Sequence, residues 1–125
     1  MKKKLLIVDD NTNYLEQISA AFGEEFEVFQ AHNGAEGLEI TQREKPDLIL
    51  LDVMMPQVSG VEMLRQLQGD METRPIPVII FSGSKLDQST KDMIQHEINV
   101  RSFVNKPCAI AMLRGEIERV LANPR

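Results

Sequence analysis

The chain has 125 residues with 14 basic and 19 acidic side chains, and its 42% hydrophobic content is ordinary for a globular domain. This length suits one domain spanning residues 1–125, and the net charge of −5 argues against direct nucleic-acid binding and against docking on an anionic membrane. A single cysteine excludes an internal disulfide, and no apolar or near-apolar run exceeds six residues, so we expect a cytoplasmic protein without a membrane span.

The first part of the chain predicts two strand–helix pairs. The apolar run Leu5–Val8 has the length of a buried strand, and the segment Asn11–Asn13 can cap the helix that follows it. The inward face of that helix repeats at helical spacing through Leu15, Ile18 and Phe22. A mixed run, Phe26–Ala31, predicts the second strand, and Asn33 can cap a second helix that carries Leu38.

The rest of the chain predicts three more such pairs. The strands are expected at Leu48–Leu51, Val78–Phe81 and Ser102–Asn105. A capping box, Ser59–Glu62, opens the third helix, and the polar segment Asp87–Ile98 predicts the fourth. The fifth helix starts near Pro107, and its apolar positions recur with helical period: Ile110, Leu113, Ile117, Val120 and Leu121.

This strict alternation of strands and helices defines the fold class. It predicts an α/β protein with a parallel sheet, right-handed crossovers and helices on both faces. The short strands are continuously apolar rather than alternating, as expected when both faces of a sheet are covered. Five strand–helix units use the whole length of the sequence, so we expect a single domain.

Polar side chains follow four of the predicted strands. Asp9 and Asp10 follow the first strand, Asp52 the third, Ser82 the fourth and Lys106 the fifth. In an open α/β sheet the carboxyl ends of the strands form the ligand-binding edge, so these side chains should lie together. Each one alone has a simpler interpretation as a turn residue, a helix cap or a surface lysine. Their joint placement at strand ends favours a site.

The chemistry of this residue set points to phosphoryl transfer. Three neighbouring carboxylates repel one another unless a cation relieves them, and oxygen-only ligands suit Mg²⁺. An ammonium and a hydroxyl beside that cation suit the charge of a phosphoryl group. One of the carboxylates can itself be the acceptor.

Five short motifs support this interpretation and occur in a fixed order. They are Leu6–Asn11, Pro46–Pro56, Ser59-Gly60, Ile80–Gly83 and Phe103–Pro107. Together they resemble the receiver domain of two-component response regulators, and the likeness covers essentially the whole chain. The resemblance implies a flavodoxin-like, doubly wound sheet of five parallel strands in the order 2-1-3-4-5 with five helices.

The resemblance also implies a role for each residue at the metal. Asp52 matches the phosphoacceptor of the family. Asp9 and Asp10 match the acidic pair that holds Mg²⁺, with Asp52 and the backbone carbonyl of Met54 as further ligands; Mn²⁺ is a possible substitute.

Three further residues match the switch of the family. Lys106 matches the lysine that pairs with a phosphoryl oxygen, and Ser82 matches the hydroxyl that moves toward the phosphoryl group on activation. Phe103 matches the aromatic position that turns inward when this hydroxyl moves. The surface of the fourth helix, fifth strand and fifth helix would then pass the signal on.

The implied partners are proteins. A sensor histidine kinase or a histidine phosphotransfer protein would donate the phosphoryl group, and a downstream protein or a fused output domain would receive the signal. On this interpretation the chain is a signalling switch that assists its own phosphorylation and dephosphorylation, not a turnover enzyme.

Three alternatives remain open. An aspartate-based phosphatase or phosphotransferase would need a second aspartate two residues after Asp52, where the chain has Met54. A nucleotide- or flavin-binding module would need a glycine-rich loop after the first strand, where the chain has acidic residues. A protein-interaction module that works without phosphorylation would not need all five site residues, yet all five are present.

Overall fold

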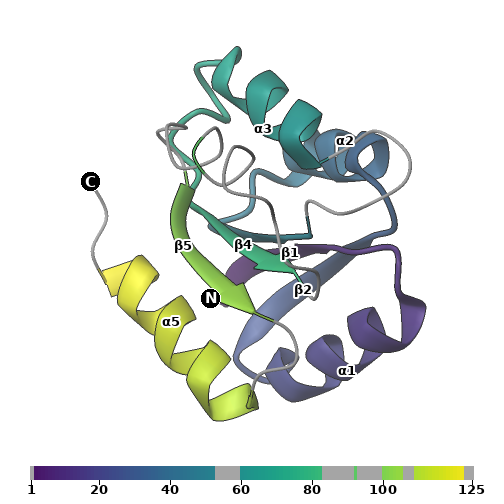
Figure 1. Ribbon diagram of the computed structural model, residues 1–125, viewed down its shortest axis with the longest axis vertical. Helices are drawn as coiled ribbons and strands as arrows, with labels where there is room; N and C mark the ends of the chain where they lie inside the picture. The colour runs from purple at the N-terminus through teal and green to yellow at the C-terminus, as the bar shows by residue number, and fades with distance from the viewer. Residues whose placement is uncertain (1, 53–59, 83–91, 93–99, 106–108, 123–125) are drawn as a thin grey trace.

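The computed structural model describes residues 2–52, 60–82, 92, 100–105 and 109–122. Within these ranges the strands and helices follow the predicted order (Figure 1). The strands are β1 (Lys3–Val8), β2 (Phe26–Ala31), β3 (Leu48–Leu51), β4 (Val78–Ser82) and β5 (Val100–Asn105). The helices are α1 (Thr12–Phe22), α2 (Gly34–Glu44), α3 (Gly60–Gln68) and α5 (Ile110–Ala122). The fourth predicted helix, Asp87–Ile98, lies outside the described residues except for Asp92.

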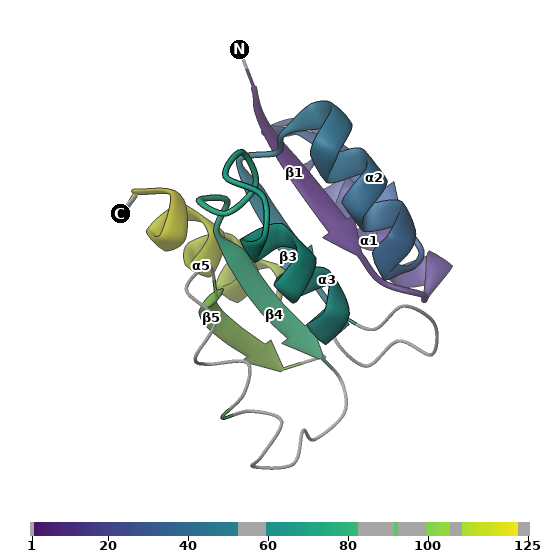
Figure 2. The same ribbon diagram turned by 90° about the horizontal axis from the view of Figure 1, so that it is seen from above.

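All five strands pair in parallel in one sheet with the order β2-β1-β3-β4-β5. This order confirms the predicted doubly wound, flavodoxin-like fold. Helices α2 and α3 cover one face of the sheet, and α1 and α5 cover the other (Figure 1). Figure 2 shows the same layers with α2 and α3 in front of the strands. None of the helices in the described ranges is long and apolar enough to cross a membrane.

Two hydrophobic cores lie between the sheet and its helix layers. Successive residues of a strand point to opposite faces, so β1 gives Leu6 and Val8 to the core beneath α2 and α3, and Leu5 and Ile7 to the other. Most of the predicted inward positions of α1 and α5 are buried in this second core: Leu15, Ile18, Phe22, Leu113, Ile117 and Val120. The other two predicted positions, Ile110 and Leu121, are partly buried against it. Because helices cover both faces of the sheet, the central strands are continuous apolar runs.

The element boundaries differ from the prediction at four elements, β1, β4, β5 and α5. Strand β1 begins at Lys3, two residues before the predicted start, and β4 ends at Ser82, one residue later than predicted. Strand β5 begins at Val100, two residues before the predicted start, because Val100 pairs with Val78 of β4 ahead of an irregularity in the register. Helix α5 begins at Ile110, and Pro107 lies outside the described residues. Asn11 and Asn33 cap α1 and α2 as predicted, accepting hydrogen bonds of 3.2 and 2.8 Å from backbone N–H groups three residues later.

Helix α2 approaches α3 and β1 closely at Gly37. An ideal Cβ built on Gly37 would lie 3.0 Å from Cε and Sδ of Met63 in α3, and 3.0 Å from Cγ2 of Val8 in β1. A hydrogen bond of 2.7 Å from the buried Thr41 hydroxyl to the Gly37 carbonyl adds to the packing here. The missing side chain of Gly37 therefore sets how closely this helix packs beside the last residue of β1.

The carboxyl end of α1 is held by cations from distant parts of the sequence. The last turn of α1 contains no basic residue of its own. Lys2 Nζ donates to the Gly23 carbonyl at 2.9 Å, and an Arg114 guanidinium nitrogen donates to the Ala21 carbonyl at 3.2 Å. The Arg114 guanidinium also pairs with Glu25 at 2.8 Å and lies 4.9 Å from the centre of the Phe22 ring. These contacts fasten α5 to α1 and complement the negative end of the α1 dipole.

Candidate functional site

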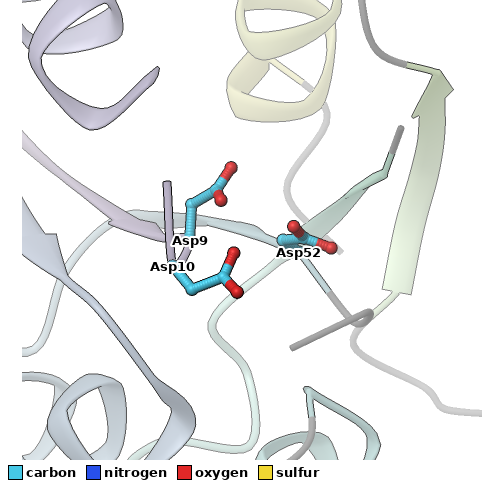
Figure 3. A group of neighbouring side chains, drawn as sticks. All are labelled: Asp9, Asp10 and Asp52. Atoms are coloured by element: carbon cyan, nitrogen blue, oxygen red, sulfur yellow. The ribbon is translucent and has the colours of Figure 1, made fainter. Parts of the chain in front are cut away.

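Three carboxylates lie together at the carboxyl edge of the sheet. Asp9 and Asp10 follow β1, and Asp52 follows β3, the strand beside it. The backbone N–H of Asp52 donates to the Val8 carbonyl at 2.9 Å, which brings the two strand ends side by side. One carboxylate oxygen from each aspartate lies within 4.8 Å of the others, and Figure 3 shows the three groups gathered at this edge. We call these residues, Asp9, Asp10 and Asp52, the acidic cluster.

The members of the acidic cluster differ in exposure. Asp9 is 1% exposed and Asp52 is 6% exposed, whereas Asp10 is open to solvent. The backbone of Asp9 is fixed to β2 through a hydrogen bond of 3.0 Å from its N–H to the Ala31 carbonyl. Its carboxylate accepts a hydrogen bond of 3.0 Å from the Asn11 N–H. Two buried carboxylates held this close require compensating positive charge.

The donor set of the acidic cluster fits a small divalent cation. A six-coordinate Mg²⁺ places its oxygen ligands about 3 to 4 Å apart, and it usually keeps several waters. Carboxylate oxygens within 4.8 Å of one another can therefore serve one such ion, through direct and water-bridged contacts. All the donors are oxygens, the ligands of hard cations, whereas nitrogen and sulfur ligands would favour transition metals.

Of the other predicted site residues, the structure describes Ser82 and Phe103 but not Lys106 and Met54. Ser82 is the last residue of β4, and the register places it beside Asn105 of β5. Phe103 is partly buried in β5 and packs against the core beneath α2 and α3. Lys106 and Met54 lie outside the described residues, so their predicted positions are not tested.

Two neighbouring contacts were not anticipated from the sequence. The Tyr14 ring of α1 lies 5.1 Å, centre to centre, from the ring of Phe81, the residue before Ser82. At the carboxyl end of β2, Glu36 accepts hydrogen bonds of 3.2 Å from the His32 ring and 3.1 Å from the His32 N–H. These bonds hold the pKa of Glu36 below its ordinary value. The Tyr14–Phe81 contact has no local sequence signature, because it depends on how α1 packs against the sheet. The His32–Glu36 pair is local, since the two residues are four positions apart at the start of α2.

Comparisons with known proteins identify the family. The profile of the response regulator receiver domain matches residues 5–118. Protein PilH of Pseudomonas aeruginosa is 35% identical over 120 residues, which are 95% of this chain and 98% of that protein. Response regulator PleD of Caulobacter vibrioides is 39% identical over 121 residues, 94% of this chain but 26% of that protein.

A solved structure agrees with the fold. It is the receiver domain of a sensor histidine kinase from Pseudomonas aeruginosa, with a magnesium ion coordinated in its active site cleft. The two structures match with a TM-score of 0.87 at 21% identity, covering 98% of this chain and 100% of the other. The chain therefore belongs to the response regulator receiver domains, the phosphoacceptor modules of two-component signalling.

Proposed function

We propose that this receiver domain accepts a phosphoryl group on Asp52 from a phosphohistidine of a sensor histidine kinase or a histidine phosphotransfer protein. The observation that carries the proposal is the acidic cluster, in which the buried Asp52 lies within 4.8 Å of two other carboxylates at the ligand-binding edge of the sheet. In the transfer, an Asp52 oxygen forms a bond to phosphorus. The phosphorus–nitrogen bond of the donor breaks, and its electron pair remains on the imidazole.

The metal site of this proposal is formed by Asp9, Asp10 and Asp52 with the backbone carbonyl of Met54. When bound there, Mg²⁺ supplies positive charge that offsets the carboxylates and the incoming phosphoryl oxygens; Mn²⁺ has compatible ligand preferences. Asp9 is held by β2 and by Asn11, so it can present its carboxylate without rearrangement. The solved receiver domain with bound magnesium has the same fold and supports this assignment.

The signal is proposed to leave the site through Lys106, Ser82 and Phe103. Phosphorylation places about two negative charges at Asp52. The ammonium of Lys106 and the hydroxyl of Ser82 gain contacts with these charges that the unphosphorylated state lacks, and only such differential contacts shift a conformational population. Movement at Ser82 opens space for Phe103, which changes the surface of the helix expected at Asp87–Ile98, of β5 and of α5.

The proposed setting is a cytoplasmic signalling switch of one domain, residues 1–125. PilH is matched over nearly its whole length and PleD over about a quarter of its length. The relatives therefore include both short proteins and longer chains that carry further domains. We propose that the output is a separate downstream protein or a fused output domain, and that the chain acts as a switch that assists its own phosphorylation and dephosphorylation rather than as a turnover enzyme.

The test is intact-mass analysis after incubation with acetyl phosphate and Mg²⁺. The unmodified chain should gain one phosphoryl group, and Asp52→Asn should gain none. Asp70→Asn is the matched control, because it removes a carboxylate from the loop after α3 and should leave the gain unchanged. A chelator in place of Mg²⁺ should suppress the reaction. No gain on the unmodified chain, or equal gain on Asp52→Asn, would contradict the proposal.

A further inference from the structure

An aromatic contact joins the first turn of α1 to the carboxyl end of β4. The ring centres of Tyr14 and Phe81 are 5.1 Å apart and their planes are inclined by 35°, within the range of favourable aromatic pairs. Phe81 is 1% exposed and directly precedes Ser82. The contact therefore lies at the same edge of the sheet as the acidic cluster, on the side covered by α1 and α5.

Hydrogen bonds connect Tyr14 to the acidic cluster along the chain. The Tyr14 N–H donates to the Asn11 side chain at 3.2 Å, and the Asn11 N–H donates to the Asp9 carboxylate at 3.0 Å. The backbone of Asp9 is in turn paired with Ala31 of β2. The short segment 9–14 is thus held at one end by the sheet and at the other end by the Tyr14 ring on Phe81.

Asp10 is the member of the acidic cluster that needs such support. It is exposed, and no other described residue forms a hydrogen bond or ion pair with its carboxylate. Repulsion from Asp9 and Asp52 would turn an unrestrained Asp10 away from the site. The position of Asp10 is therefore set by its backbone, which the anchored first turn of α1 fixes.

We propose that Tyr14 is a positioning residue for the acidic cluster. Its ring contact with Phe81 anchors the first turn of α1, which holds Asp9 and Asp10 facing Asp52 and ties this loop to the strand end that carries Ser82. The inference rests on the proposed function, because it gives the acidic cluster the task of holding Mg²⁺.

A second aromatic pair at the other end of α1 provides a matched control. Phe22, the last residue of α1, packs against Phe26, the first residue of β2, with ring centres 6.1 Å apart. Both pairs fasten α1 to the sheet, but the Phe22–Phe26 pair lies at the end away from the acidic cluster. Removing either ring lowers stability, so an effect confined to Tyr14 separates positioning from general packing.

The experiment measures Mg²⁺ affinity by calorimetry in the unmodified chain and in three variants. An aromatic contact of this kind implies that Tyr14→Leu weakens Mg²⁺ binding by about two- to tenfold. Tyr14→Phe keeps the ring and should bind within about twofold of the unmodified chain, since the aromatic contact of the ring is retained. Phe26→Leu should unfold at lower urea concentration while its Mg²⁺ affinity stays unchanged.

Fluorescence gives an independent readout. The chain has one tyrosine and no tryptophan, so its intrinsic emission comes from Tyr14 alone. Because coupling between two sites is reciprocal, Mg²⁺ should protect Tyr14 from quenching by acrylamide. The Asp10→Asn variant, which lacks one ligand, should show less protection at the same Mg²⁺ concentration.

The outcomes separate this inference from the proposed function. Full Mg²⁺ affinity in Tyr14→Leu, an equal loss in Phe26→Leu, or unchanged quenching at saturating Mg²⁺ would each refute the positioning role and leave the proposed function intact. If the unmodified chain itself binds no Mg²⁺, the proposed metal site is wrong and the positioning role falls with it.

Discussion

Replacing Gly37 with alanine tests the close approach of α2 to α3 and β1. The added Cβ would lie 3.0 Å from three side-chain atoms, two of them at the flexible end of Met63. The third is Cγ2 of Val8, a β-branched side chain in a buried strand with little rotamer freedom. Met63 can move aside, but Val8 cannot without shifting β1, and Val8 is the residue before Asp9. We therefore expect Gly37→Ala to destabilise the fold.

The size of the change in free energy of unfolding follows from a comparison with Gly115 in α5. An alanine Cβ at Gly115 would meet nothing within 4 Å, so Gly115→Ala should gain only the helix propensity of alanine, about 1 kcal/mol. Gly37→Ala gains the same propensity but adds overpacking, which costs about 1 to 3 kcal/mol in a filled core. The two variants should therefore differ by about 1 to 3 kcal/mol in free energy of unfolding, with Gly115→Ala the more stable.

Equilibrium urea unfolding, followed by circular dichroism, measures this difference. With a slope of about 2 kcal/mol per molar urea, a difference of about 2 kcal/mol separates the two midpoints by about 1 M. Equal stabilisation by both substitutions would refute the reasoning. It would show that α2 has room for a methyl group and that its distance from Val8 is not set by a glycine.

Two further predictions concern charged side chains. Arg114→Met removes the ion pair, carbonyl contact and ring contact at the end of α1 and should lower the free energy of unfolding by about 1 kcal/mol. Arg43→Met removes a guanidinium that is 57% exposed together with its ion pairs to Glu39 and Glu44, and should change the free energy of unfolding by less than about 0.5 kcal/mol. Equal effects of the two substitutions would contradict the role given to Arg114. Hydrogen bonds led by that from Arg119 hold the pKa of Glu116 below its ordinary 4.5, so ionised Glu116 stabilises the fold above this pH, and the contribution is lost as pH falls through the lowered pKa. The stability of the unmodified chain should exceed that of Glu116→Gln at pH 7, and the two curves should converge in acid; parallel curves down to pH 3 would rule out this linkage.

Much of the fold could be predicted because strands that are buried on both faces of a sheet appear in the sequence as short, continuous apolar runs. Strands β2 and β3 begin and end at the predicted residues, since each is bounded by turn or capping residues. The predicted start of β5 is two residues late because the charged Arg101 separates Val100 from the rest of the strand. Its first residue joins the sheet through pairing with Val78, a distant part of the chain that local sequence does not encode.

The candidate site likewise contains features that the sequence predicts and others that depend on contacts between distant residues. Asp9, Asp10 and Asp52 come together because the ends of adjacent parallel strands must meet, and topology alone brings them there. The contact between Tyr14 and Phe81 joins residues 67 positions apart and depends on the packing of α1 over β4. No local sequence pattern therefore predicts it. The roles of the predicted site residues, including Lys106 and Met54, stay predictions.

The contacts that cap the carboxyl end of α1 come from residues that are synthesised at very different times. Lys2 is present before α1 is synthesised, but Arg114 emerges 93 residues after Ala21, whose carbonyl it caps. At about 5 to 20 residues per second, ribosomal synthesis separates the two by about 5 to 20 seconds. During that interval β1, α1 and β2 can pack together, but the carboxyl end of α1 and the Phe22 ring still lack their contacts with Arg114. A nascent chain therefore carries α1 incompletely capped until α5 has docked.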